Sequence, residues 1–181
     1  MWRHRLMLRF CRAISAPALG ALLATAACRG SMGRPVERGD TPPPFSLETL
    51  QGEVLRFPEG FAGRRGVVVC FWSATCPVCE GKLKDLDPVA GRLAGTGVSF
   101  VAINVGQDRG MVEAISRKLG VGFPLIVDGS AATAKAWGVQ TLPTTFFLGS
   151  DGRVVDKLVG DADAAAFEES ARRLVAPGGR P

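Results

Sequence analysis

The sequence is poor in histidine: its 181 residues include one, His4, which lies in the N-terminal stretch. Nucleophilic catalysis by Ser-His-Asp or Cys-His arrangements requires an imidazole beside the nucleophile. Covalent haem attachment requires a histidine directly after a Cys-x-x-Cys pair, and Glu80 occupies that position after Cys79. These three kinds of chemistry are therefore excluded from the folded domain.

Metal-ligating residues are also scarce. Of the five cysteines, Cys76 and Cys79 form the only Cys-x-x-Cys pair, and no second pair of cysteine or histidine residues accompanies it. A structural zinc site needs four such ligands, so we predict no zinc site. Two thiolates alone suit copper(I), which keeps a non-catalytic peptide- or copper-binding module open as an alternative to redox chemistry.

Excess positive charge is confined to one end of the chain. The formal net charge is +5, but Arg3, Arg5, Arg9 and Arg12 all precede residue 28 with no acidic residue among them. The remainder holds 18 basic and 17 acidic residues, without a cluster of Lys and Arg interleaved with aromatic residues. We therefore expect no binding to nucleic acid.

The chain also lacks an uninterrupted apolar run long enough for a transmembrane helix, which needs about 20 residues. Its longest apolar stretch, residues 13–27, follows a basic start, is interrupted by Ser15, Pro17 and Thr25, and closes with small residues. This pattern is typical of an export signal. We predict a signal peptide over residues 1–27 and a protein that acts outside the cytoplasm, in the periplasm or anchored to the membrane on that side.

The residues around Cys28 leave two processing routes open. Small residues directly precede this cysteine, as in a bacterial lipoprotein box, although Thr25 stands where that pattern prefers leucine. Lipidation of Cys28 would give the protein a lipid anchor. Cleavage after Ala26 or Ala27 would instead release a soluble protein with an incidental free thiol.

Residues 28–44 are rich in Gly, Arg, Pro and polar side chains and end in Thr41-Pro42-Pro43-Pro44. Such a composition predicts a flexible tether. We place one domain at residues 45–177 and a disordered tail at residues 178–181.

Within the domain, apolar patterns of strand and helix period alternate. Gln51-Gly52 marks the turn of an N-terminal hairpin, and Asp161 is the expected cap of the last helix. The alternation predicts an α/β domain with a mixed sheet and helices on its faces. We expect strands at residues 45–47, 54–57, 67–72, 98–103, 123–127, 144–148 and 154–158, and helices at residues 78–93, 111–119, 131–137 and 161–175.

The Cys-x-x-Cys pair stands between the buried strand at residues 67–72 and the first helix. This position places the Cys76 sulfur at a helix N-terminus, where free N–H groups and the helix dipole favour the thiolate. Cys79, one turn further on, can close a disulfide with Cys76 and release whatever Cys76 has attacked. The pattern therefore predicts a redox dithiol that needs no cofactor besides its own disulfide.

Four segments resemble the TlpA/ResA-like exported disulfide reductases of the thioredoxin fold. They are Phe71–Glu80 with its flanking strand and helix, Val101–Gly106, Gly120–Pro124 and Gly138–Phe146. The resemblance implies a thioredoxin-like fold with an N-terminal hairpin and a central αβ insertion. It further implies protein disulfide substrates, among them apocytochrome c, a membrane thiol electron donor, and a role in cytochrome c maturation or envelope redox homeostasis.

The same resemblance assigns a substrate-binding role to the Leu142-Pro143 pair. In this family the proline is cis and packs against the dithiol, which exposes the backbone of Leu142 to an extended substrate segment. Trp72, just before the dithiol, is the third expected substrate-binding residue, with core packing as its alternative role.

The sequence departs from the family pattern at three positions around the dithiol. Thr75 stands where a tryptophan often precedes the first cysteine, Cys70 replaces a buried carboxylate, and Lys82 replaces a glutamate. Cys70 is expected to act as a small hydrophobic residue. For the missing acids we weigh two possibilities: Lys82 favours the Cys76 thiolate, or Glu80 takes over proton transfer.

A peroxidase is a further alternative, because peroxiredoxins share this fold and its N-terminal hairpin. Those enzymes require the pattern Pro-x-x-x-Thr-x-x-Cys, whereas Val69, Ser73 and Cys76 occupy the corresponding positions here. The missing proline argues against peroxidase activity.

Overall fold

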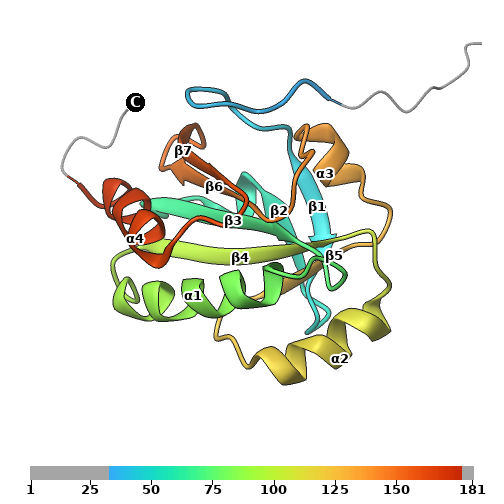
Figure 1. The fold of residues 1–181 in the computed structure, drawn as a ribbon. Coiled ribbons are helices and arrows are strands. Elements are labelled where there is room, and N and C mark those ends of the chain that lie inside the picture. Colours follow the sequence, from blue (N-terminus) through green and yellow to red (C-terminus); the bar gives the residue numbers. More distant parts are fainter. Residues whose placement is uncertain (1–32, 177–181) are drawn as a thin grey trace, which may run out of the picture. The chain divides into compact units, whose positions relative to one another are not determined.

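The computed structural model describes residues 33–176, and a mixed five-stranded sheet with strand order β5-β4-β3-β6-β7 lies at its centre (Figure 1). β3 pairs in parallel with β4 and antiparallel with β6, and β4 pairs in parallel with β5. A separate antiparallel hairpin joins β1 to β2. The strands are β1 (Phe45–Glu48), β2 (Val54–Phe57), β3 (Gly66–Trp72), β4 (Val98–Val105), β5 (Leu125–Asp128), β6 (Thr144–Gly149) and β7 (Val154–Val159).

Four α-helices and one short 3-10 helix accompany these strands within the described residues, and the last helix follows the final strand. The order of strands and α-helices is the one predicted from the sequence. The helices are η1 (Glu59–Phe61), α1 (Cys79–Arg92), α2 (Arg109–Leu119), α3 (Ala132–Ala136) and α4 (Ala164–Arg173).

The central strand β3 is buried along its whole length, because elements cover both faces of the sheet. Val68, Cys70 and Trp72 point to a core that also contains side chains of α1, α2 and α4. The alternate residues of β3 point to a second core against the β1–β2 hairpin and α3. An uninterrupted apolar, β-branched sequence is what a strand covered on both faces requires.

Trp137, at the end of α3, is the centre of the second core. Its ring lies 5.1 Å from that of Phe146 and 5.3 Å from that of Phe71, measured between centroids. The indole is fully buried, and its Nε1–H donates to the carbonyl of Pro43 at 2.9 Å. This hydrogen bond attaches the N-terminal segment to the aromatic cluster.

The packed domain begins before Phe45. The backbone N–H of Gly33 donates to Lys135 O, that of Val36 donates to Trp137 O, and the Val36 side chain is 5% exposed. A Cβ built on Gly138, whose φ is +63°, would lie 2.5 Å from the Cα of Pro35. The expected flexible tether at residues 28–44 therefore overlaps the packed domain from Gly33 onward, while residues 1–32 and 177–181 lie outside the described residues.

Several element boundaries differ by a few residues from the expected ones, and two of these differences have clear local reasons. Asp163, not Asp161, caps α4, with its side chain accepting from the N–H of Ala166 at 2.8 Å. β5 begins at Leu125 instead of residue 123, directly after Pro124, which has no N–H to donate to a ladder. Pro88 lies inside α1, which continues past it to Arg92.

The position of Trp137 gives a first prediction. Trp137→Ala should lower the free energy of unfolding by about 3–5 kcal/mol, because it removes the ring at the centre of the second core. Trp137→Phe keeps a ring but leaves the Pro43 carbonyl without its donor, so a smaller loss of about 1–3 kcal/mol is expected. Guanidinium-induced unfolding measures both, and an equal loss in the two variants would contradict the role given to the ring.

Candidate active site

The dithiol lies where β3 ends and α1 begins. Cys76 and Cys79 are joined in a disulfide, with their Cα atoms 5.4 Å apart. Cys76 is partly exposed, whereas Cys79 has no exposed surface. Pro77 and Val78, between the two cysteines, are exposed, so this turn lies at the surface. Only Cys76 can therefore be attacked from outside or make the first attack.

The start of α1 supplies the electrostatic environment of the pair. Val78 occupies the N-cap position, and no side chain caps this end of the helix. The free N–H groups of the first turn form the positive end of the helix dipole, which is directed at the cysteines. No carboxylate or hydroxyl in the cap position competes for these groups. This arrangement stabilises a thiolate at Cys76 once the disulfide is reduced.

The Leu142-Pro143 pair lies next to the dithiol. The Cys76 sulfur is 3.6 Å from the carbonyl oxygen of Leu142, and the peptide bond between Leu142 and Pro143 is cis. The pairing of Phe71 in β3 with Thr144 in β6 brings this loop to the end of the strand that carries the cysteines. Leu142 is partly exposed and Pro143 is buried.

Gln107 is a site residue that the sequence analysis missed. Its Oε1 accepts from the backbone N–H of Ala74 at 2.7 Å and from Asn104 Nδ2 at 2.8 Å. Ala74 lies two residues before Cys76, so this bridge fixes the active-site loop to the end of β4. The sequence signal is weak, because a polar residue after a buried strand is common in any loop.

Near this bridge, one buried side-chain donor and one buried side-chain acceptor have no hydrogen-bond partner among the described residues. Among the described residues, Trp72 Nε1 and Asn104 Oδ1 are buried and form no hydrogen bond. Trp72 and Asn104 are register partners in β3 and β4. The Trp72 side chain has no exposed surface, so the expected contact between Trp72 and substrate is corrected here to core packing.

Lys82 and Glu80 are both engaged in ion pairs. The Lys82 ammonium lies 2.8 Å from Asp161 Oδ1 and 3.0 Å from Asp85 Oδ2, and these pairs raise the pKa of Lys82. Glu80 Oε2 lies 2.9 Å from the ammonium of Lys118. Each charge near the dithiol is thus partly compensated by a neighbour on another element.

Cys70 lies in the core on the same face of the sheet as Trp72 and is 1% exposed. Burial raises the pKa of its thiol to about 11, partly offset by a hydrogen bond with Thr145. Cys70 is therefore a neutral thiol in the physiological pH range. It occupies the position of the family's buried carboxylate, so no negative charge is held there.

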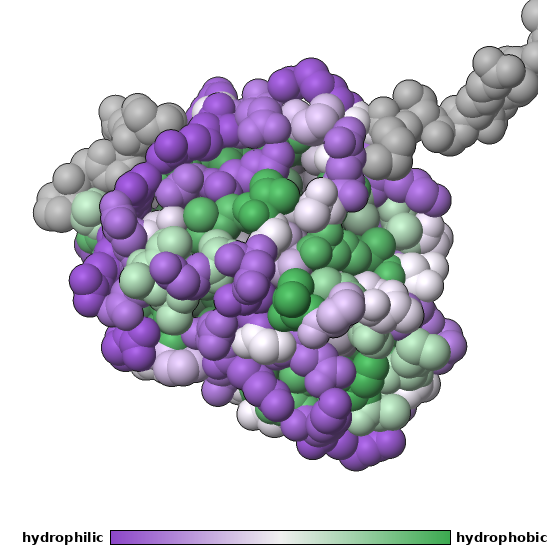
Figure 2. All heavy atoms as spheres, viewed as in Figure 1, coloured by the Kyte–Doolittle hydropathy of each residue, from purple (hydrophilic) through white to green (hydrophobic). Residues whose placement is uncertain are grey.

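The described residues do not include the possible lipidation site, and they hold no candidate membrane span or metal site. Cys28, the possible lipidation site, lies outside the described residues. No helix among residues 33–176 is long and apolar enough to cross a membrane, and hydrophilic residues are interspersed with apolar ones over the face drawn in Figure 2. The same residues contain no group of three or more His, Cys, Asp or Glu side chains that could hold a metal ion.

A redox disulfide with one accessible sulfur, at a helix N-terminus and against a cis-proline loop, defines a thiol–disulfide oxidoreductase of thioredoxin-like fold. Comparison with known proteins agrees. The sequence matches the Redoxin family over residues 37–173, and the chain belongs to that family.

Curated relatives make the assignment more specific. The thiol-disulfide oxidoreductase ResA of Geobacillus thermodenitrificans is 32% identical over 122 residues, which are 67% of this chain and 69% of that protein. ResA of Bacillus subtilis is 27% identical over 143 residues, 79% and 78% of the two chains. The resemblance to TlpA/ResA-like proteins is therefore confirmed.

Solved structures confirm the fold. A crystal structure of a putative thiol:disulfide interchange protein DsbE from Chlorobium tepidum superposes with a TM-score of 0.72 at 23% identity, covering 78% of this chain and 99% of that one. StoA from Bacillus subtilis gives a TM-score of 0.61 at 24% identity, covering 71% and 96%.

The Gln107 bridge gives a second prediction. Gln107→Leu should cost about 1–3 kcal/mol of stability and speed hydrogen exchange at the Ala74 amide, because two donors lose their acceptor. Gln107→Glu keeps an acceptor oxygen for both donors and should retain slow exchange. Exchange at Ala74 that is equally fast in the wild-type protein would contradict the bridge.

Cys70 gives a third prediction, on the pH dependence of stability. The unfolded thiol loses its proton above pH of about 8.5, whereas the folded one keeps it to about pH 11, so the unfolded state binds fewer protons between these values. The oxidised protein should therefore lose up to about 3 kcal/mol of stability as pH rises through this window. Cys70→Val should remove this part of the decline in stability. Parallel curves of unfolding free energy against pH for the two proteins would contradict the role given to Cys70.

Proposed function

We propose that the protein reduces disulfide bonds of exported polypeptides through Cys76 and Cys79. The observation that carries the proposal is the difference between the two sulfurs: Cys76 is accessible and lies against Leu142, while Cys79 is fully buried behind it. The reductive direction rests on the similarity to ResA-like proteins.

In the proposed reaction the Cys76 thiolate attacks one sulfur of the substrate disulfide. The substrate disulfide breaks, a mixed disulfide forms, and the second substrate sulfur leaves as a thiolate that takes up a proton. The Cys79 thiolate then attacks the Cys76 sulfur and releases the first substrate sulfur. The substrate gains two electrons, and the protein is left with the Cys76–Cys79 disulfide that the structure contains.

A thiol donor must return those two electrons. We propose a membrane dithiol as the donor, because the export signal predicted at residues 1–27 would place the protein away from cytoplasmic reductants. Lipidation of Cys28 would hold the protein at the same surface. An apocytochrome c whose haem-binding cysteines have been oxidised is the substrate we propose first.

The backbone around Leu142 is proposed to hold the substrate. Its carbonyl already lies 3.6 Å from the Cys76 sulfur, so a substrate strand that hydrogen-bonds to this backbone would bring its own disulfide over Cys76. Pro143, with no N–H of its own, shapes that loop without competing for the substrate's acceptors.

The direct test is insulin reduction with dithiothreitol as the electron source. Cys76→Ser should abolish the acceleration of reduction, and Cys79→Ser should accumulate a mixed disulfide through Cys76 that mass spectrometry detects. The reduction potential of the couple decides direction: a value well below the glutathione range supports a reductase, and a strongly oxidising value would overturn the proposed direction.

Lys82 is proposed to favour the Cys76 thiolate. Lys82→Ala should raise the pKa of Cys76, because it removes a cation from the first helical turn and leaves Asp85 and Asp161 without their partner. Lys84→Ala, an exposed residue on the same helix, is the matched control and should leave that pKa unchanged. The pH dependence of Cys76 alkylation measures both, and an unchanged pKa in Lys82→Ala would favour Glu80 as the proton-handling group.

A further inference from the structure

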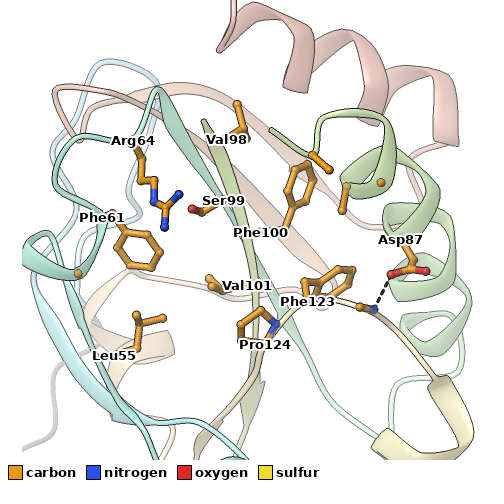
Figure 3. Close-up of a pocket in the computed structure, with 15 residues that line it drawn as sticks. Leu55, Phe61, Arg64, Asp87, Val98, Ser99, Phe100, Val101, Phe123 and Pro124 are labelled. Carbon is orange, nitrogen blue, oxygen red and sulfur yellow. Dashed lines mark hydrogen bonds between the residues drawn. The ribbon is translucent and has the colours of Figure 1, made fainter. Parts of the chain in front are cut away.

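A groove of about 570 Å³ lies at the start of β4 (Figure 3), and the register of the sheet places it at the end opposite the dithiol. β3 and β4 run parallel, with Gly66 opposite Val98 and Trp72 opposite Asn104, so the groove lies beside the first residues of β4 and the cysteines follow the last residues of β3. Its walls are mainly apolar. They include Leu55, Phe61, Ala94, Val98, Phe100 and Phe123.

The floor of the groove is an open sheet edge. β5 pairs with β4 only from Ala102 onward, and the Ala102 N–H donates to the carbonyl of Pro124 at 3.0 Å. Backbone groups two residues apart in a strand face the same side, so those of Phe100 and Val98 face the groove as well. By this alternation the N–H and carbonyl of Phe100 point away from β3, and no turn, loop or side-chain group between residues 33 and 176 bonds to them.

Pro124 is the reason that the edge stays open. It lies next to β4 in the position where a longer β5 would continue, but it has no N–H to donate. Val98 makes one weak contact, from its N–H to Thr96 Oγ1 at 3.5 Å. The groove therefore offers a donor and an acceptor at Phe100 and an acceptor at Val98, spaced as in a strand.

One uncompensated charge borders this edge. Arg64 lines the groove and its guanidinium points toward Ser99 in Figure 3, and it forms no ion pair with any residue between 33 and 176. Asp87, on the opposite wall, is already used, since its Oδ1 accepts from the Gly122 N–H at 2.7 Å. The free charge of the groove is thus positive.

We propose that this groove binds an extended, apolar polypeptide segment that carries a carboxylate, as an additional strand on β4. The backbone of the segment pairs with Phe100 and Val98, and its carboxylate pairs with Arg64. Successive side chains of the segment point to the two walls of the groove in turn. The four residues at 98–101 span about 13 Å, which matches a segment of four to five residues.

This proposal rests on the proposed function in one respect. A disulfide substrate that also carries such a segment would be held at two places, so its disulfide would meet Cys76 at a raised effective concentration. Because the binding itself needs neither cysteine, it is measured separately from reduction.

The first experiment measures binding of the acetylated peptide Val-Thr-Val-Thr-Asp to the oxidised protein by NMR. The expected result is a set of shifts at residues 98–101 and at Phe61. Gly91→Leu, which fills an open position in the groove wall, and Arg64→Glu should each weaken binding at least tenfold. Gly91→Ala and Arg117→Glu, an exposed change outside the groove, should bind as the wild type does.

The same peptide with N-methylated amides tests the backbone pairing and should lose binding. Equal affinity of the N-methylated peptide, shifts confined to the region of Cys76 and Leu142, or no binding at millimolar concentration would each overturn the proposal. A shift pattern that reports self-association of the protein in place of peptide binding would overturn it as well.

The second experiment compares two disulfide-bonded peptide substrates, one with and one without the Val-Thr-Val-Thr-Asp segment on a flexible linker. The segment should lower KM at least fivefold with kcat unchanged, and Gly91→Leu should remove this difference while still reducing the plain substrate. An equal KM for both substrates overturns the groove proposal, whereas loss of reduction for both contradicts the proposed function.

Discussion

The structure depends above all on the pairing of β3 with two neighbours of opposite direction. β4 lies parallel on one side and β6 antiparallel on the other, and the strand between them is fully buried. The parallel neighbour brings Asn104 and Gln107 to the end of β3, and the antiparallel neighbour brings Leu142 and Pro143 to the same end. The dithiol that follows β3 therefore meets both its hydrogen-bonded support and its substrate-binding loop without a long connection.

The charges around the dithiol follow from the same arrangement. Cys70 is a neutral buried thiol, and the nearest charged side chains on α1, Glu80 and Lys82, bind partners on α2 and before α4. The helix N-terminus is left as the main fixed electrostatic influence on Cys76. A site of this kind stabilises a thiolate through oriented backbone groups more than through a counterion. The stability of the Cys76 thiolate therefore depends on the position of the loop that Gln107 fixes.

Much of this could be predicted from local sequence patterns. The apolar run of β3, the period of the helices and the Cys-x-x-Cys spacing report contacts within one element, and they gave the order of elements and the redox pair correctly. The contact of Gln107 with Ala74, the ion pair of Lys82 with Asp161 and the packing of residues 33–44 against α3 depend on residues more than 30 positions apart, which no local pattern encodes. Asp161 and Asp163 both precede the last helix, and the sequence does not distinguish them as caps. In the structure Asp163 caps α4, and Asp161 pairs with Lys82.

The contact between Gly138 and Pro35 has a mechanical consequence. The backbones of the two residues are so close that a single added methyl group would collide, and hydrogen bonds from Gly33 and Val36 hold the same segment against α3. Gly138 begins the loop that leads to Pro143. A force on residues 33–36 is therefore passed through this contact to the loop beside Cys76, so the N-terminal segment of the domain and its reactive end are mechanically coupled.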